Sequence, residues 1–138
     1  MRVDYKKIHL DQQQKKLIRR TILENPYIPV TPYDRQLYAI ADRHTRKLIG
    51  GSAYSGKSML GAVLALQHYE VPYYRCLILR STYDNVIATG GIVDYLDHWT
   101  EPFDYIEHNQ SKRCFINHEN DARIYYSYML LEKDLSLI

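Results

Sequence analysis

The sequence predicts an α/β fold in which helices cover a mainly parallel sheet in three layers. Two observations favour this class. Short apolar runs with strand character alternate with segments of helical spacing, and a glycine-containing loop separates one such run from the next helix. With 138 residues and 46% hydrophobic composition, the chain is long enough for one core and short for two domains.

The first segment of the chain is basic and helical. Residues 1–23 carry seven lysines and arginines against two aspartates, a local charge of +5 in a chain of net charge +2. Apolar residues recur at helical spacing over residues 10–24, which predicts an amphipathic helix that ends at Asn25. We interpret residues 1–25 as a basic N-terminal helical arm, which either contacts nucleic-acid phosphates or, more ordinarily, presents a solvated helix face.

The elements that follow alternate between helices and strands. A connector with three prolines precedes a helix expected from Tyr33 to about residue 44. The remaining expected elements are a buried strand at 47–50, a helix at 57–68, a buried strand at 75–79, a helix at 84–99 and an antiparallel hairpin formed by 113–117 and 123–129. A strand, a helix and a strand in succession predict parallel pairing of the two strands.

Residues 51–58 read GSAYSGKS and match the phosphate-binding pattern GxxxxGK[ST]. Lys57 would bring its charge to the β and γ phosphates of ATP, and the hydroxyl of Ser58 would bind Mg²⁺. The alternative is a purely structural glycine turn. The backbone N–H groups that would turn inward around the phosphates belong to Gly51, Ser52, Ala53, Tyr54, Ser55 and Gly56.

Two residues upstream of this loop have the chemistry of an adenine-binding element. Gln36 can offer a donor and an acceptor to the edge of the base, and the ring of Tyr33 can stack on its face. A tyrosine and a glutamine one turn apart are otherwise an ordinary helix surface. The adenine-binding interpretation is favoured only because the phosphate-binding pattern follows these two residues in the sequence.

Other residue types do not form recognisable sites. Cys76 and Cys114 lack metal-ligand spacing and are expected to be reduced thiols, and the six histidines show no zinc pattern. Asp94 and Asp97 fit a solvated helix face better than an acid pair. The absence of a signal peptide and of a long apolar run predicts a soluble protein without a membrane partner.

Four segments, in this order, resemble the N-terminal ATPase domain of the large terminase subunit of tailed viruses. The resemblance covers roughly residues 26–135, and we interpret residues 26–138 as a partial domain of the P-loop NTPase type. It implies ATP hydrolysis that packages double-stranded DNA into a procapsid in the cytoplasm of the infected host cell. The segments are PYDRQLYAI (32–40), KLIGGSAYSGKSMLGAVLAL (47–66), YRCLILRSTYDNVI (74–87) and CFINHENDARIYYSYM (114–129).

The resemblance also implies partners and residue roles. Double-stranded DNA, the portal, the small terminase subunit and further copies of the chain on DNA are the implied partners. Arg80 would sense nucleotide or contact DNA, unless it only forms a salt bridge at the strand end. Ala53 stands where many members carry an arginine, which leaves Arg46, Arg80 or a neighbouring subunit to stabilise the transition state.

The family also requires a buried strand that ends in paired acids, and a nuclease domain after it. Neither YIEHN nor LEKDLSLI has this form, and the sequence ends at Ile138. We therefore expect a fragment with a sheet incomplete at its C-terminal side, which binds ATP weakly and hydrolyses it poorly. The alternatives are another P-loop NTPase, helicase-like or a kinase, and a docking fragment without turnover.

Overall fold

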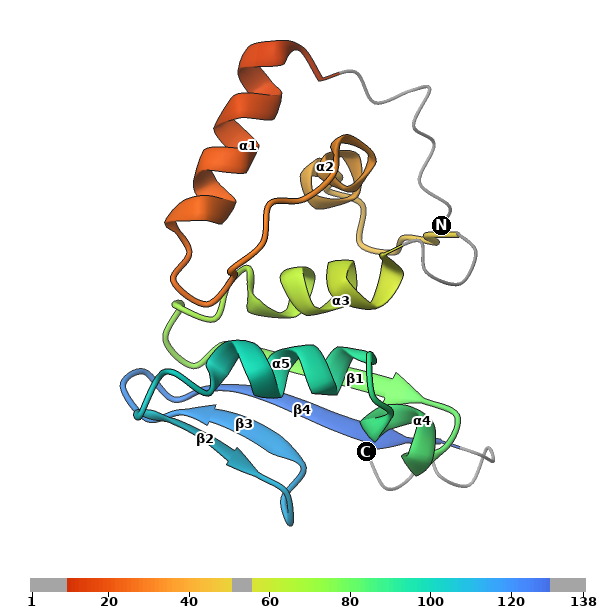
Figure 1. Cartoon of the computed structure of the whole chain (residues 1–138), viewed down its shortest axis with the longest axis vertical. Helices are drawn as coiled ribbons and strands as arrows, with labels where there is room; N and C mark the ends of the chain where they lie inside the picture. Colours follow the sequence, from red (N-terminus) through yellow and green to blue (C-terminus); the bar gives the residue numbers. More distant parts are fainter. Residues whose placement is uncertain (1–9, 51–55, 130–138) are drawn as a thin grey trace.

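The computed structural model describes residues 10–50 and 56–129, and Figure 1 shows one sheet with helices stacked beside it. The α/β class predicted from the sequence is confirmed. In chain order, the described elements are α1 (Gln12–Glu24), α2 (Asp34–Ala41), α3 (Lys57–Leu66), β1 (Arg75–Arg80), α4 (Tyr83–Ile87), α5 (Ile92–Thr100), β2 (Ile106–Asn109), β3 (Cys114–Asn117) and β4 (Ala122–Tyr128).

The sheet is mixed rather than mainly parallel. Its order is β1-β4-β3-β2, in which β1 and β4 are parallel and the other two pairs are antiparallel. The prediction of a mainly parallel sheet is therefore wrong for the part of the chain that the structure describes. β1 pairs in parallel with β4, which is distant in the sequence. The sequence had suggested the segment at 47–50, one helix earlier in the chain, as its partner. The predicted hairpin is confirmed as β3 and β4, and β2 was not predicted.

The segment that precedes the predicted phosphate loop does not join this sheet. Residues 47–50 contain only an isolated bridge at Leu48, whose side chain is 61% exposed, so the prediction of a buried strand there is wrong. A four-residue run bounded by lysine and glycine offers only two apolar side chains for burial. The Lys47 ammonium instead donates to the Ala39 carbonyl at 3.1 Å, which ties this segment to the end of α2.

The helix predicted at 84–99 is divided into α4 and α5. Gly90 adopts a left-handed conformation with φ +79°, and a Cβ on Gly91 would lie 3.0 Å from the Ala88 carbonyl oxygen. These two glycines make a turn that a continuous helix would not permit. The Asp94 carboxylate accepts from the Gly90 N–H at 2.8 Å and so secures the turn to the start of α5.

Helices α3 and α5 lie against each other and on one face of the sheet (Figure 1). Gly61 permits this close approach, because a Cβ there would lie 2.6 Å from the Cδ1 of Ile92. On the opposite face of β1, Leu77 and Leu79 are 45% and 38% exposed, so β1 is only half-buried. The core between helices and sheet includes Val63, Leu66, Tyr69, Val93, Leu96, Phe115 and Ile124.

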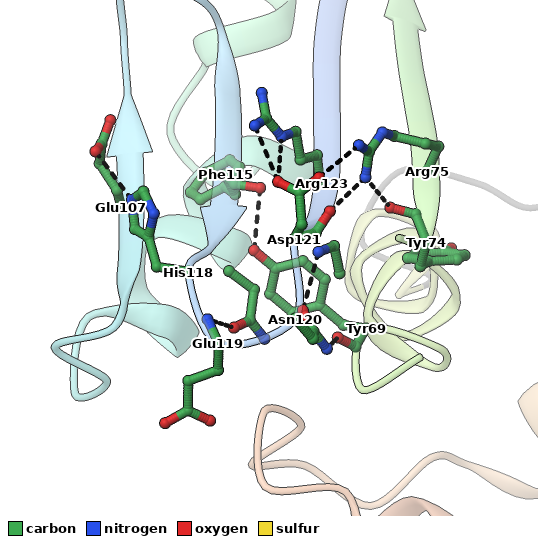
Figure 2. Close-up of polar contacts among 12 residues, drawn as sticks. Tyr69, Tyr74, Arg75, Glu107, Phe115, His118, Glu119, Asn120, Asp121 and Arg123 are labelled. Carbon is green, nitrogen blue, oxygen red and sulfur yellow. Dashed lines mark hydrogen bonds and ion pairs between the residues drawn. The ribbon is translucent and has the colours of Figure 1, made fainter. Parts of the chain in front are cut away.

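The turn between β3 and β4 is held by a polar network, shown in Figure 2. The Asp121 carboxylate lies between Arg123 at 2.9 Å and Arg75 at 3.0 Å, and hydrogen bonds from these guanidinium groups lower the pKa of Asp121. Asn120 donates to the Tyr69 carbonyl at 3.1 Å. The network therefore joins the starts of β1 and β4 to the segment that follows α3.

Helix α1 is fixed to the domain by both apolar and charged contacts. Its Ile22 side chain is 1% exposed and belongs to the core. On the basic face, Lys15 pairs with Asp34 of α2 at 3.7 Å, and Arg19 pairs with the same carboxylate. Part of the positive charge of the arm is thus balanced within the chain. No helix within residues 10–50 and 56–129 has the length and apolar character required to cross a membrane.

Candidate functional site

The first turn of α3 carries the described part of the predicted phosphate loop. Gly56 is the N-cap with φ +84°, a left-handed conformation that costs a residue with a Cβ about 1–2 kcal/mol. Its carbonyl accepts the first helical hydrogen bond, from the Leu60 N–H at 2.9 Å. Lys57 and Ser58 follow as the first two helical residues, where the positive end of the helix favours an anion.

The structure brings the predicted adenine-binding pair to this same turn. The Gln36 amide nitrogen donates to the Gly56 carbonyl at 3.3 Å, and a Cβ on Gly56 would approach that nitrogen to 2.9 Å. The nearest carbon of the Tyr33 ring would lie 3.9 Å from the same Cβ position. Residues about twenty positions apart in the sequence therefore share one small region.

Tyr33 and Gln36 differ in their availability to a ligand. The Gln36 side chain is buried and its amide oxygen accepts from the Tyr33 N–H at 2.8 Å, which caps the start of α2. Two of the four hydrogen-bonding positions of the amide are therefore used within the chain, and the residue is only 7% exposed. The Tyr33 ring is 66% exposed, so one of its faces is open to stacking.

Ser58 and Arg80, which come from different predicted motifs, line one cavity of about 200 Å³. Ser58 is half-buried in the first turn of α3, and Arg80 is the last residue of β1. Asn85 of α4 and the turn at residues 88–91 also line the cavity. The arrangement places a cation and a hydroxyl around a space next to the positive end of a helix.

Part of the predicted site lies outside the described residues. Gly51, Ser52, Ala53, Tyr54 and Ser55 belong to this part, so their roles in phosphate binding stay predictions. Arg46 lies within the described residues and is exposed, but it does not line the cavity that contains Arg80.

A second polar cluster, centred on His108, was not predicted from the sequence. His108 of β2 contacts Asp97 of α5 through Nδ1 at 2.8 Å and the Tyr126 hydroxyl through Nε2 at 2.7 Å. Its ring stacks on Phe115 with centroids 4.1 Å apart. The Asp97 side chain is 55% exposed, as expected of a solvated helix face, and its contact with His108 also joins α5 to β2. Because Tyr126 is only 3% exposed, we interpret this relay as structural. Recognition of β2 as a strand would have revealed it.

Comparisons of the chain with models of protein families, with curated proteins and with solved structures give no match. The interpretation of the site therefore depends on the motif and on the geometry around α3.

Proposed function

We propose that this chain binds Mg²⁺·ATP at the start of α3, as P-loop NTPases do. The observation that carries the proposal is the hydrogen bond between the Gln36 amide and the Gly56 carbonyl, because it places the expected adenine-binding residue next to the expected phosphate loop. Lys57 and Ser58 follow at the positive end of the helix. There Lys57 would neutralise phosphate charge, Ser58 would hold Mg²⁺, and Tyr33 with Gln36 would face the base.

Within that class, we propose that the chain is the ATP-binding part of a large terminase subunit, which powers the packaging of double-stranded DNA. The support is the order of the four motifs together with the meeting of Ser58 and Arg80 at one cavity. ATP would be the cofactor, and DNA and the packaging partners would bind the assembled motor. The sheet of the described residues is mixed, unlike the mainly parallel sheet that the sequence predicted.

The first test is a titration of the chain into a fluorescent ATP analogue with Mg²⁺, followed by anisotropy. ATP, GTP and inorganic phosphate compete in separate experiments. We expect saturable binding that ATP displaces best and that Lys57→Ala abolishes. Lys16→Ala removes an exposed lysine of α1 and is the matched control, with binding unchanged. A folded chain that binds no nucleotide, or that binds equally well as Lys57→Ala, would refute the proposal.

A second experiment separates a packaging ATPase from other P-loop enzymes. Hydrolysis of ATP is measured with and without linear double-stranded DNA and with single-stranded DNA as the comparison. Stimulation by the duplex supports the packaging motor. ATP binding with preferential stimulation by single strands would favour a helicase-like protein, and phosphate transfer to a small acceptor would favour a kinase.

A further inference from the structure

Strand β1 lies at one edge of the sheet, and its outer side has no strand partner among the described residues. The carbonyls of Tyr74 and Arg80 accept from N–H groups on the β4 side, at 2.8 and 2.9 Å. Residues two positions apart in a strand direct their backbone groups to the same side. The N–H and C=O groups that face the free edge therefore belong to Arg75, Leu77 and Leu79.

The free edge of β1 lacks the features that protect most edge strands. Between its terminal arginines the strand reads CLIL, without a lysine or a proline, and its register with β4 runs without a bulge. On the face away from α3 and α5, Leu77 and Leu79 are 45% and 38% exposed. An apolar edge with unpaired backbone groups is a template on which another strand can add.

Positive charge at the two ends of β1 sets the chemistry of such a strand. Arg75 and Arg123 share the one carboxylate of Asp121, which leaves a positive charge in excess at the start of β1 (Figure 2). Arg80, at the other end, is exposed and has no carboxylate partner among the described residues. A strand with an acid opposite each end and apolar residues between them is complementary to this edge.

The surface beside the free edge is positive as well. A hollow of about 590 Å³ is lined by Arg75 and Leu77 of β1 and by Lys112 and Arg113 of the turn before β3, and no acid is among the described residues that line it. Charges within about 10 Å of one another still interact at 0.1 M salt. An acidic segment that approaches β1 is therefore attracted before it pairs.

We propose that the free edge of β1 binds an extended acidic segment of another protein, which adds a strand to the sheet. Its backbone would pair with that of β1, and its apolar side chains would lie beside Leu77 and Leu79. A second copy of the chain fits less well, because two antiparallel β1 strands would bring Arg75 of each copy within one position of Arg80 of the other. Nucleic acid could use the charge but has no strand backbone to pair with the edge. The proposal is independent of the ATP site.

The test adds the peptide acetyl-EVTVTE-amide to the ¹⁵N-labelled chain. Antiparallel to β1, this peptide places its valines opposite Leu77 and Leu79 and its glutamates opposite Arg75 and Arg80. In the free chain, the two leucine amides should exchange with solvent faster than the amide of Ile78, which faces β4. The peptide should shift the β1 resonances in a saturable manner and slow the exchange of both leucine amides.

Two further peptides separate the backbone contribution from the charge contribution. N-methylvaline in place of the valine opposite Leu77 removes one backbone donor and should weaken binding at least about fivefold. KVTVTK reverses both flanking charges and should bind at least about tenfold more weakly at low salt. Equal affinity for EVTVTE and its N-methyl form would show that charge alone attracts the peptide, and would overturn strand addition.

A pair of protein variants tests the apolar part of the edge. Leu77→Thr keeps a strand-forming residue and removes apolar surface, so it should weaken EVTVTE by about two- to fivefold. Leu48→Thr makes the same change at a residue that is 61% exposed and outside the sheet, and the affinity should be retained. Equal effects of the two variants would contradict binding at β1.

The remaining outcomes identify a different occupant of the edge, and each would overturn the proposal. Leucine amides at 77 and 79 that are protected in the free chain at every concentration would show that the chain itself covers the edge. Protection that rises with protein concentration would identify a second copy. Larger shifts of β1 with a DNA oligonucleotide than with EVTVTE would assign this surface to nucleic acid.

Discussion

The conformation of Gly56 gives the most specific prediction about the structure of the site. In Gly56→Ala, a Cβ would be forced into a left-handed conformation, at about 1–2 kcal/mol, and would meet the Gln36 amide nitrogen at 2.9 Å. The flexible glutamine can move away, but it then gives up its bond to the Gly56 carbonyl, worth about 1 kcal/mol. We expect a loss of about 2–3 kcal/mol in the free energy of unfolding.

Urea denaturation measures this loss, and two further variants identify its origin. Gly50→Ala is the matched control, because no heavy atom lies within 4 Å of its Cβ position among the described residues. It should change stability by less than about 0.5 kcal/mol. In a Gln36→Ala background, the cost of Gly56→Ala should fall to the backbone strain alone. A Gly56→Ala protein as stable as wild type, or a cost unchanged by Gln36→Ala, would refute the reasoning.

Three more predictions concern the packing and the polar network. Leu66→Ala removes a fully buried side chain and should lower the free energy of unfolding by about 2–5 kcal/mol in thermal or urea unfolding. Leu79→Ala, at a residue that is 38% exposed, should lower it by less than about 1 kcal/mol. Equal losses in the two variants would contradict the assigned core. Asn25→Ala should cost about 1–3 kcal/mol, because the buried side chain donates to the Leu66 carbonyl at 3.0 Å; an unchanged urea midpoint would contradict this contact. Because its arginine partners lower the pKa of Asp121, the stability that this carboxylate adds is present at neutral pH and is lost as the pH falls through the folded-state pKa. Urea unfolding should therefore show Asp121→Asn less stable than wild type near pH 7 and equal to it in acid. A difference in stability that widens in acid would contradict the ion pairs.

The sequence predicted the local features of the fold well. The amphipathic spacing before Asn25, the helix that begins at Lys57 and the hairpin of β3 and β4 each depend on residues near one another in the chain. The motif around Gly56 also indicated Gln36 as a companion, and the hydrogen bond between them confirms that the two lie together.

The errors come from contacts between distant residues. Periodicity marked 75–79 as a strand but carried no information on its partner, which is β4 rather than a strand at 47–50. The helical spacing of 84–99 concealed the turn at Gly90, because a left-handed glycine leaves the apolar pattern on either side intact. The sequence indicated Ser58 and Arg80 separately, but their meeting at one cavity depends on the position of β1 beside α3, which periodicity does not specify.

The most direct test of the ATP site is the change in backbone amide resonances of the ¹⁵N-labelled chain on addition of Mg²⁺·ATP. If the nucleotide binds as proposed, the largest shifts will fall on Gly56, Lys57 and Ser58, with smaller shifts at Gln36 and at the turn of residues 88–91. Shifts confined to the opposite face of the sheet, around Leu77, or no shifts in a folded sample, would contradict the account.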